Sequence, residues 1–185
     1  MKMKTVDFSS FYFIVSQLIQ NMVLKIPKKI ENILIFLIIP LVGFICDYTS
    51  KQAIIEYICV SNSHITILPF FNIVCVLNTG VSFGMMSSVE NGKTILLVLT
   101  TLILVFIYFL TYKEKDKFVQ YCYSVIIAGA FGNIIDRAIN GGVIDFLDFH
   151  YKHMHYPSFN IADSLIFIGV FGIIIRQLTQ KKQVH

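Results

Sequence analysis

Long apolar stretches alternate with short polar segments along most of this chain. One begins at about Ile33 and runs into the polar segment Asp47–Lys51; the others cover about 94–112, 118–135 and 160–178. A helix needs about 20 mostly apolar residues to cross a bilayer, so the pattern predicts four membrane-spanning helices. Residues 61–88 differ, because β-branched and aromatic residues lie there between Pro69 and turn-forming Asn and Gly residues. This segment predicts short strands outside the membrane.

The first thirty residues form a separate segment. Val6–Leu24 is rich in apolar residues but is interrupted by Ser, Gln and Asn, and lysines follow it. We expect an N-terminal extension over residues 1–30 that forms an interfacial helix, followed by a four-span domain over residues 31–180. An additional span is the alternative, since the apolar stretch approaches the length of about 20 residues that a span requires.

Composition and charge fit an integral membrane protein. The 185 residues are 56% hydrophobic and 14% charged, whereas soluble domains have about 25% charged residues. Four spans place the basic clusters at 25–29, 113–117 and 176–182 on the same side of the membrane. The positive-inside rule makes that side cytoplasmic and predicts that both termini are cytoplasmic. Because these clusters are short and adjoin apolar runs, they do not indicate a nucleic-acid partner.

The four cysteines lack the spacing of a metal site. Cys46 and Cys122 lie in apolar stretches and are predicted to be buried free thiols. Cys59 and Cys75 could meet outside the membrane, but their spacing leaves the pairing open.

The predicted topology brings Asp47, Asp136, Asp145 and Asp163 to the outer edge of the membrane. An ionisable residue within a membrane segment costs about 2.5–3.5 kcal/mol, so each of these acids is a candidate functional residue. Asp47 and Lys51 are four residues apart and share a helix face. They form either an interfacial ion pair, with Lys51 extending to the headgroups, or the border of an active cleft.

The third predicted span has a stripe of small residues that ends in an acid. Such a stripe lets two helices approach closely, and it directs the acid into their interface. Its members are Ser124, Ala128, Gly132 and Asp136. Arg137 follows Asp136 directly and Asn133 precedes it by about one turn, which predicts an ionised, paired carboxylate at Asp136.

Asp145 and Asp163 have different surroundings. Asp145 has apolar neighbours and no adjacent cation, so desolvation should raise its pKa. Asp163 lies three residues after Asn160, a predicted N-cap, in the first turn of a helix whose dipole favours negative charge. In a pair of carboxylates, the ionised one can activate water while the protonated one polarises a peptide carbonyl. We therefore expect Asp145 to be protonated and Asp163 to be ionised.

Other chemistries are less well supported by the residues. The His-rich segment 150–155 could bind a metal, but its spacing matches no common zinc pattern, and we expect a solvated surface loop that includes Asp148. A metal-dependent protease using these histidines is one alternative. A transporter that uses the acid cluster as an ion pathway is another, although the cluster lies at only one membrane edge.

Five segments, in order along the chain, resemble the bacterial lipoprotein signal peptidases (signal peptidase II), a family of membrane aspartyl proteases. The resemblance covers about residues 33–178, and Ala128 stands where the family usually has glycine. The five segments are Asp47–Lys51, Asn78–Gly84, Gly129–Arg137, Val143–Phe146 and Phe159–Asp163.

The resemblance implies hydrolysis of prolipoproteins just before a diacylglyceryl-modified cysteine, with Asp145 and Asp163 as the catalytic pair. It implies a monomer in the lipid of the bacterial cytoplasmic (inner) membrane, with the active site facing the outer leaflet and the strands cradling the substrate. No metal or cofactor is expected. The implied supporting or substrate-binding residues are Asp47, Lys51, Asn78, Gly80, Asn133, Asp136, Arg137 and Asn160.

Overall fold

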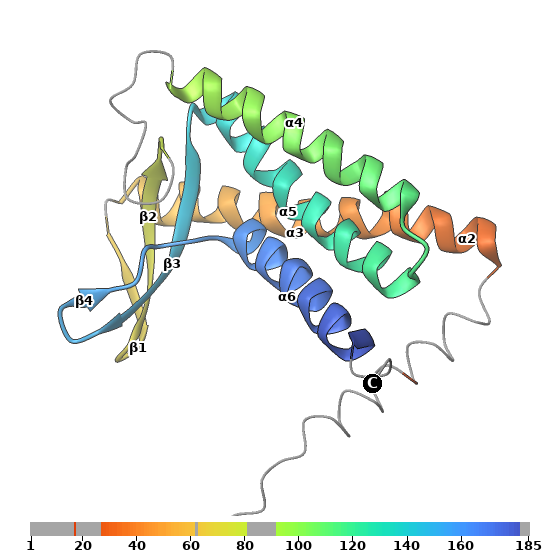
Figure 1. The fold of residues 1–185 in the computed structure, drawn as a ribbon. Coiled ribbons are helices and arrows are strands. Elements are labelled where there is room, and N and C mark those ends of the chain that lie inside the picture. Colours follow the sequence, from red (N-terminus) through yellow and green to blue (C-terminus); the bar gives the residue numbers. More distant parts are fainter. Residues whose placement is uncertain (1–16, 18–26, 62, 81–91, 182–185) are drawn as a thin grey trace, which may run out of the picture.

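The protein is a bundle of long helices with an antiparallel sheet at one end (Figure 1). The computed structural model describes residue 17 and residues 27–61, 63–80 and 92–181. Within these residues, four helices are long and apolar enough to cross a membrane, which confirms the predicted number of spans. They cover Lys28–Cys59, Gly92–Lys113, Lys117–Asn140 and Ile161–Gln180. Apart from residues 17 and 27–30, the predicted N-terminal extension lies outside the described residues.

The first span is one continuous helix with two π-helical turns. It consists of α2 (Lys28–Ile33), η1 (Leu34–Ile38), α3 (Ile39–Ile54) and η2 (Ile55–Cys59). In a π turn each N–H bonds to the carbonyl five residues back, so the partner for the Ile35 carbonyl would be Pro40, which has no N–H. The Ser124 hydroxyl donates to that carbonyl instead, at 2.6 Å. The sequence placed Asp47–Lys51 at the end of this span, but the helix continues to Cys59.

Helix α5 (Lys117–Asn140) is the centre of the bundle. Most of its length is buried, whereas α4 (Gly92–Lys113) and α6 (Ile161–Lys181) expose most of their apolar side chains on the outside of the bundle. Asp116 caps the start of α5 by accepting from the backbone N–H of Phe118, and it also pairs with Arg176 of α6 at 2.7 Å. Gly141 ends α5 with a left-handed φ of 68°, a conformation that glycine adopts without strain.

The sheet has four strands in the order β1-β2-β3-β4, and all neighbours are antiparallel. β1 (Ile65–Leu68) and β2 (Phe71–Asn78) confirm the predicted strand segment. β3 (Val143–Tyr151) and β4 (Met154–His155) replace the predicted loop between the last two spans. The sheet lies where η2 ends and α6 begins (Figure 1). Asp145 is therefore presented by a strand.

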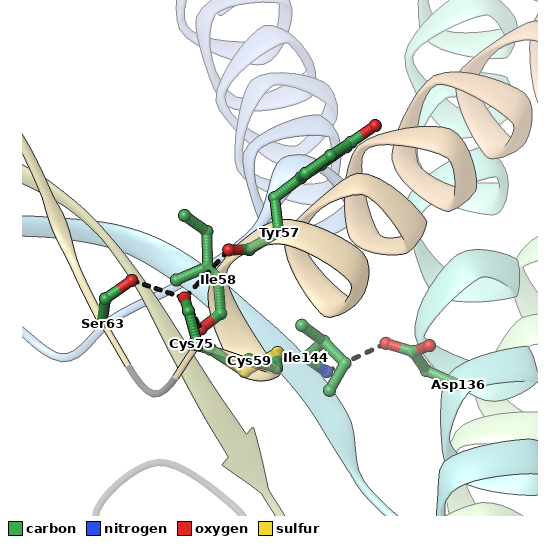
Figure 2. The surroundings of a disulfide bond; sticks show 8 residues. Tyr57, Ile58, Cys59, Ser63, Cys75, Asp136 and Ile144 are labelled. Carbon is green, nitrogen blue, oxygen red and sulfur yellow. Dashed lines mark hydrogen bonds between the residues drawn. A yellow bond between two sulfur atoms is a disulfide. The ribbon is translucent and has the colours of Figure 1, made fainter.

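The structure agrees with the prediction for Cys122 and differs from it for Cys46. Cys59 and Cys75 form a disulfide that joins η2 to β2 (Figure 2). Cys122 is a buried free thiol, as predicted. Cys46 is free but exposed, because it lies on the outer face of α3, next to Asp47, which faces inward. The prediction of a buried Cys46 is therefore wrong.

Candidate active site

Asp145 is buried at the junction of the sheet and the helices. It is the third residue of β3 and is 3% exposed. Its carboxylate accepts hydrogen bonds from the side-chain amides of Asn160, at 2.7 Å, and Asn78, at 3.0 Å. Asn78 is paired with Val143 across the strands, so it lies diagonally opposite Asp145 on the same face of the sheet.

Asp163 lies in the first turn of α6 and is half-buried. Its backbone N–H donates to Oδ1 of Asn160 at 2.9 Å, which confirms Asn160 as the N-cap of the helix. Its carboxylate accepts from the Asn133 amide at 2.8 Å. The side chain therefore points from the helix start toward α5.

One buried amide joins the two acids. Asn160 is fully buried, and its Nδ2 donates to the Asp145 carboxylate while its Oδ1 accepts from the Asp163 backbone. Burial raises the pKa of the Asp145 carboxyl to about 6; the Asn78 amide opposes this rise, and the nearby Asp163 charge adds to it. This direction agrees with the effect expected from the apolar neighbours of Asp145. The structure thus brings the two predicted carboxylates together, and their catalytic roles stay predictions.

A buried ion cluster lies behind this pair. Lys51 is only 1% exposed, and its ammonium lies 2.7 Å from Asp47 and 3.1 Å from Asp136. The alternative in which Lys51 extends to the membrane surface is therefore wrong. Lys51 also donates to Oδ1 of Asn133 at 3.0 Å. With that oxygen occupied, the Asn133 amide is oriented so that its Nδ2 reaches Asp163.

Asp47 and Asp136 each connect the cluster to another element. Asp47 accepts from the backbone N–H of Ala162, one of the N–H groups at the start of α6 that have no partner within the helix. Asp136 accepts from the backbone N–H of Ile144 at 2.9 Å and so ties α5 to β3. The cluster therefore fixes the position of both elements that carry the two candidate catalytic acids.

Arg137 has a different partner from the one predicted. The cation paired with Asp136 is Lys51, while Nη1 of Arg137 donates to the backbone carbonyl of Asn133 at 3.3 Å. Arg137 still acts electrostatically on Asp136, and also on Asp145 and Asp163. The sequence missed the Lys51–Asp136 pair because the two residues lie on different spans.

Gly80 contributes through its backbone. Its N–H donates to Oδ1 of Asn78 at 3.2 Å, which leaves the amide nitrogen of Asn78 for Asp145. Residues 81–84 of the matching segment Asn78–Gly84 lie outside the described residues.

An apolar groove of about 500 Å³ opens beside Asp163. The sequence did not identify this groove. The available signal was the spacing from Asp163 and Ser164 to Phe167 and Ile168, which places these residues on one face of α6. The groove is lined by Tyr156, Phe159, Asp163, Ser164, Phe167 and Ile168.

The His-rich segment forms the β3–β4 hairpin rather than a loop. Residues 151–155 are exposed, as predicted, but the predicted exposure of Asp148 is wrong. Asp148 is buried and accepts from Asn72 at 3.0 Å, while Nδ1 of His155 lies 2.8 Å away. Burial alone would raise the pKa of Asp148, but the hydrogen bonds from Asn72 and His155 outweigh it and lower that pKa. In the part of the chain that the structure describes, no group of three or more His, Cys, Asp or Glu side chains could hold a metal ion.

Comparison with known proteins identifies the family of this chain. The family model described as signal peptidase (SPase) II matches residues 38–179. The lipoprotein signal peptidase of Thermodesulfovibrio yellowstonii is 42% identical over 85% of this chain and 99% of that protein. The lipoprotein signal peptidase of Pelagibacter ubique is 38% identical over 81% of this chain and 91% of that protein.

A solved structure described as a bacterial membrane enzyme has a TM-score of 0.68 to this chain and is 32% identical to it. The alignment covers 79% of this chain and 88% of that one. A second structure with the same description has a TM-score of 0.67 and is 33% identical, over 76% of this chain and 90% of that one. The predicted resemblance to the signal peptidase II family is confirmed, and this chain belongs to that family of lipoprotein signal peptidases.

Proposed function

We propose that this chain is an aspartic endopeptidase that removes the signal peptide of prolipoproteins by cleaving just before the diacylglyceryl-modified cysteine. Membership of the signal peptidase II family supports the substrate class. One observation supports the Asp pair above all: a single buried amide, Asn160, bonds to the Asp145 carboxylate and to the backbone N–H of Asp163. Asp163 in turn lines an apolar groove.

The proposed reaction uses the two carboxylates in opposite protonation states. Asp163, ionised, takes a proton from a water molecule, and the water oxygen attacks the scissile carbonyl carbon. Asp145 donates its proton to the carbonyl oxygen, a role suited to a pKa near 6. When the tetrahedral intermediate collapses, the C–N bond breaks and the leaving amine takes the proton held on Asp163. One hydroxyl of the intermediate returns its proton to Asp145, which gives the carboxylic acid product and restores both side chains. The apolar groove beside Asp163 receives the lipid-modified part of the substrate.

The proposed orientation places the sheet and the site at the outer leaflet of the bacterial cytoplasmic membrane. The start of α2, the end of α4, the start of α5 and the end of α6 lie at the opposite end of the bundle (Figure 1). These helix ends carry Lys28, Lys113, Lys117 and Arg176, and the positive-inside rule assigns them to the cytoplasm. The Cys59–Cys75 disulfide at the sheet end agrees, since disulfides persist on the oxidising side of the membrane. With the four spans of the described residues, Lys28 at the start of the first span and Lys181 at the end of α6 then both lie on the cytoplasmic side.

A cleavage assay with matched variants tests the proposal. Purified wild-type protein and the variants Asp145→Asn, Asp163→Asn and Asp148→Asn are incubated with a lipidated precursor and with its unmodified form. We expect cleavage of the lipidated form only, and a loss of at least about 100-fold in each variant of the proposed pair. Asp148 lies on the same strand but bonds to His155, so Asp148→Asn should keep its activity.

Two other results would replace the proposal. Loss of cleavage on adding a chelator would indicate a metal-dependent protease. Proton or cation flux in proteoliposomes, without cleavage of either precursor, would indicate a transporter.

A further inference from the structure

The disulfide is attached to the sheet at a β-bulge in strand β2. Ile73 and Val76 of β2 lie three residues apart, but their partners in β3, Leu147 and Asp145, lie only two residues apart. β2 therefore has one more residue than β3 over this stretch. Cys75 lies within this β-bulge, directly before Val76, which is the strand partner of Asp145. A bulge bends its strand and redirects the residues that follow it. The residue held by the disulfide is therefore part of the bend that precedes the site.

The end of β2 carries a group that touches the proposed catalytic acid. Asn78 lies three residues after Cys75 and ends the strand, and its amide donates to the Asp145 carboxylate at 3.0 Å. A misplacement of about 1 Å is enough to lose much of such a contact. The position of Asn78 thus depends on how the bulged part of β2 is held.

The two central strands are attached to the helices in different ways. β3 is attached through Ile144, whose N–H donates to Asp136 and whose carbonyl accepts from Asn160. β2 is attached through Cys75, which is bonded to Cys59 at the end of η2. Ile144 and Asp136 lie in the surroundings of this disulfide (Figure 2). The covalent bond and the hydrogen bonds therefore fix the two strands at neighbouring points.

We propose that the Cys59–Cys75 disulfide is a positioning element of the active site: it holds the bulged end of β2 so that the Asn78 amide meets the Asp145 carboxylate. The proposal rests on the peptidase function proposed above. A dithiol reductant would transfer two electrons and two protons to the disulfide, yielding the Cys59 and Cys75 thiols and the oxidised cyclic dithiol. The end of β2 would then be free to move, and the Asn78–Asp145 hydrogen bond would be lost.

A positioning role predicts a measurable change at Asp145. The Asn78 hydrogen bond lowers the pKa of Asp145, so its loss on reduction should raise that pKa further. The charged groups that act on Asp145 from the neighbouring helices are Asp163, Lys51 and Arg137. Reduction of the disulfide alters the chemical structure of none of these three side chains. A disulfide that only stabilises the fold would lower the melting temperature and leave this titration unchanged.

The kinetic test compares wild-type protein, Cys59→Ser/Cys75→Ser, Asn78→Ala and the triple variant. Cys46→Ser is the matched control, because Cys46 is a free thiol on the outer face of α3. With the lipidated precursor, dithiothreitol should lower kcat about tenfold in wild-type and Cys46→Ser protein. This is the scale of one hydrogen bond to a charged group, because Asp145 becomes a carboxylate as it donates its proton. Dithiothreitol should not affect the Cys59→Ser/Cys75→Ser variant. Asn78→Ala should also lower kcat about tenfold. The triple variant, which combines Asn78→Ala with Cys59→Ser/Cys75→Ser, should lower kcat no further, since effects that act through one contact are not additive.

A second measurement does not depend on cleavage. The carboxyl carbon of Asp145 is titrated by NMR in oxidised and reduced protein, with Asp145→Asn used for assignment. Reduction should raise the Asp145 pKa in wild-type protein and leave it unchanged in Asn78→Ala. Unchanged kcat and titration, additive losses in the triple variant, or unfolding on reduction would each overturn the positioning role. Oxidised wild-type protein that leaves the lipidated precursor intact would instead refute the peptidase function, and the titration would still decide the role of the disulfide.

Discussion

At the scale of single residues, the Asn160 side chain makes two contacts with different roles, and substitution can separate them. It caps α6 through Oδ1 and holds Asp145 through Nδ2. Asn160→Ala removes both, whereas Asn160→Ser keeps a capping oxygen but lacks an amide long enough to reach Asp145. We expect both variants to lose most cleavage activity. Only Asn160→Ala should also lower the stability, by about 1 kcal/mol, as measured by thermal unfolding. Normal cleavage by Asn160→Ser would show that the link between the acids is dispensable.

The pKa of Asp145 predicts how stability depends on pH. Its folded-state pKa of about 6 lies above its ordinary value of 3.8, so the folded protein binds the proton more tightly than the unfolded chain. The free energy of unfolding should therefore fall as the pH rises from about 4 to about 6, by an amount of order 2 kcal/mol. Asp145→Asn removes this contribution. Unfolding of both proteins across this pH range isolates it as their difference; a constant difference would contradict the raised pKa.

At the scale of elements, the packing of α3 against α5 depends on Gly132. A Cβ at this position would collide with the Asp47 carboxylate, which pairs with Lys51. Gly132→Ala should therefore destabilise the protein by about 1–3 kcal/mol, the usual cost of overpacking, and should reduce cleavage. Ala138→Ser also adds one heavy atom to α5, but at an exposed position, and should change neither. Equal melting temperatures for the two variants would show that the helices adjust to the added group.

The sequence identified elements well where their signals are local. The spans follow from apolar runs, the pairing of Asp47 with Lys51 from helical spacing, and the N-cap from Asn160. Strand β3 was missed because its pairing partner, β2, lies more than sixty residues earlier in the chain. The second partner of Lys51 was missed for the same reason, since it lies on another span.

At the scale of the whole molecule, the acids gather because helices of alternating direction bring their outer ends together. One end of the bundle holds the sheet, the disulfide and the buried cluster, and the other holds basic residues. A charged cluster within membrane-spanning helices is costly unless its members pair with one another. Lys51 pairs with two acids contributed by two helices, so neither helix could supply the site alone.

The proposed orientation can be tested with two probes, each of which adds one exposed cysteine. His153 is exposed on the β3–β4 hairpin, and Lys115 is exposed in the connection between α4 and α5. Each is changed to cysteine in a Cys46→Ser background, where the remaining free thiol, Cys122, is buried. In spheroplasts, a membrane-impermeant maleimide should label His153→Cys, while Lys115→Cys should react only after lysis. The reverse pattern would place the sheet in the cytoplasm, where the disulfide would be exposed to reduction. The site could not then meet a substrate at the outer leaflet, so the proposed function would fail together with the orientation.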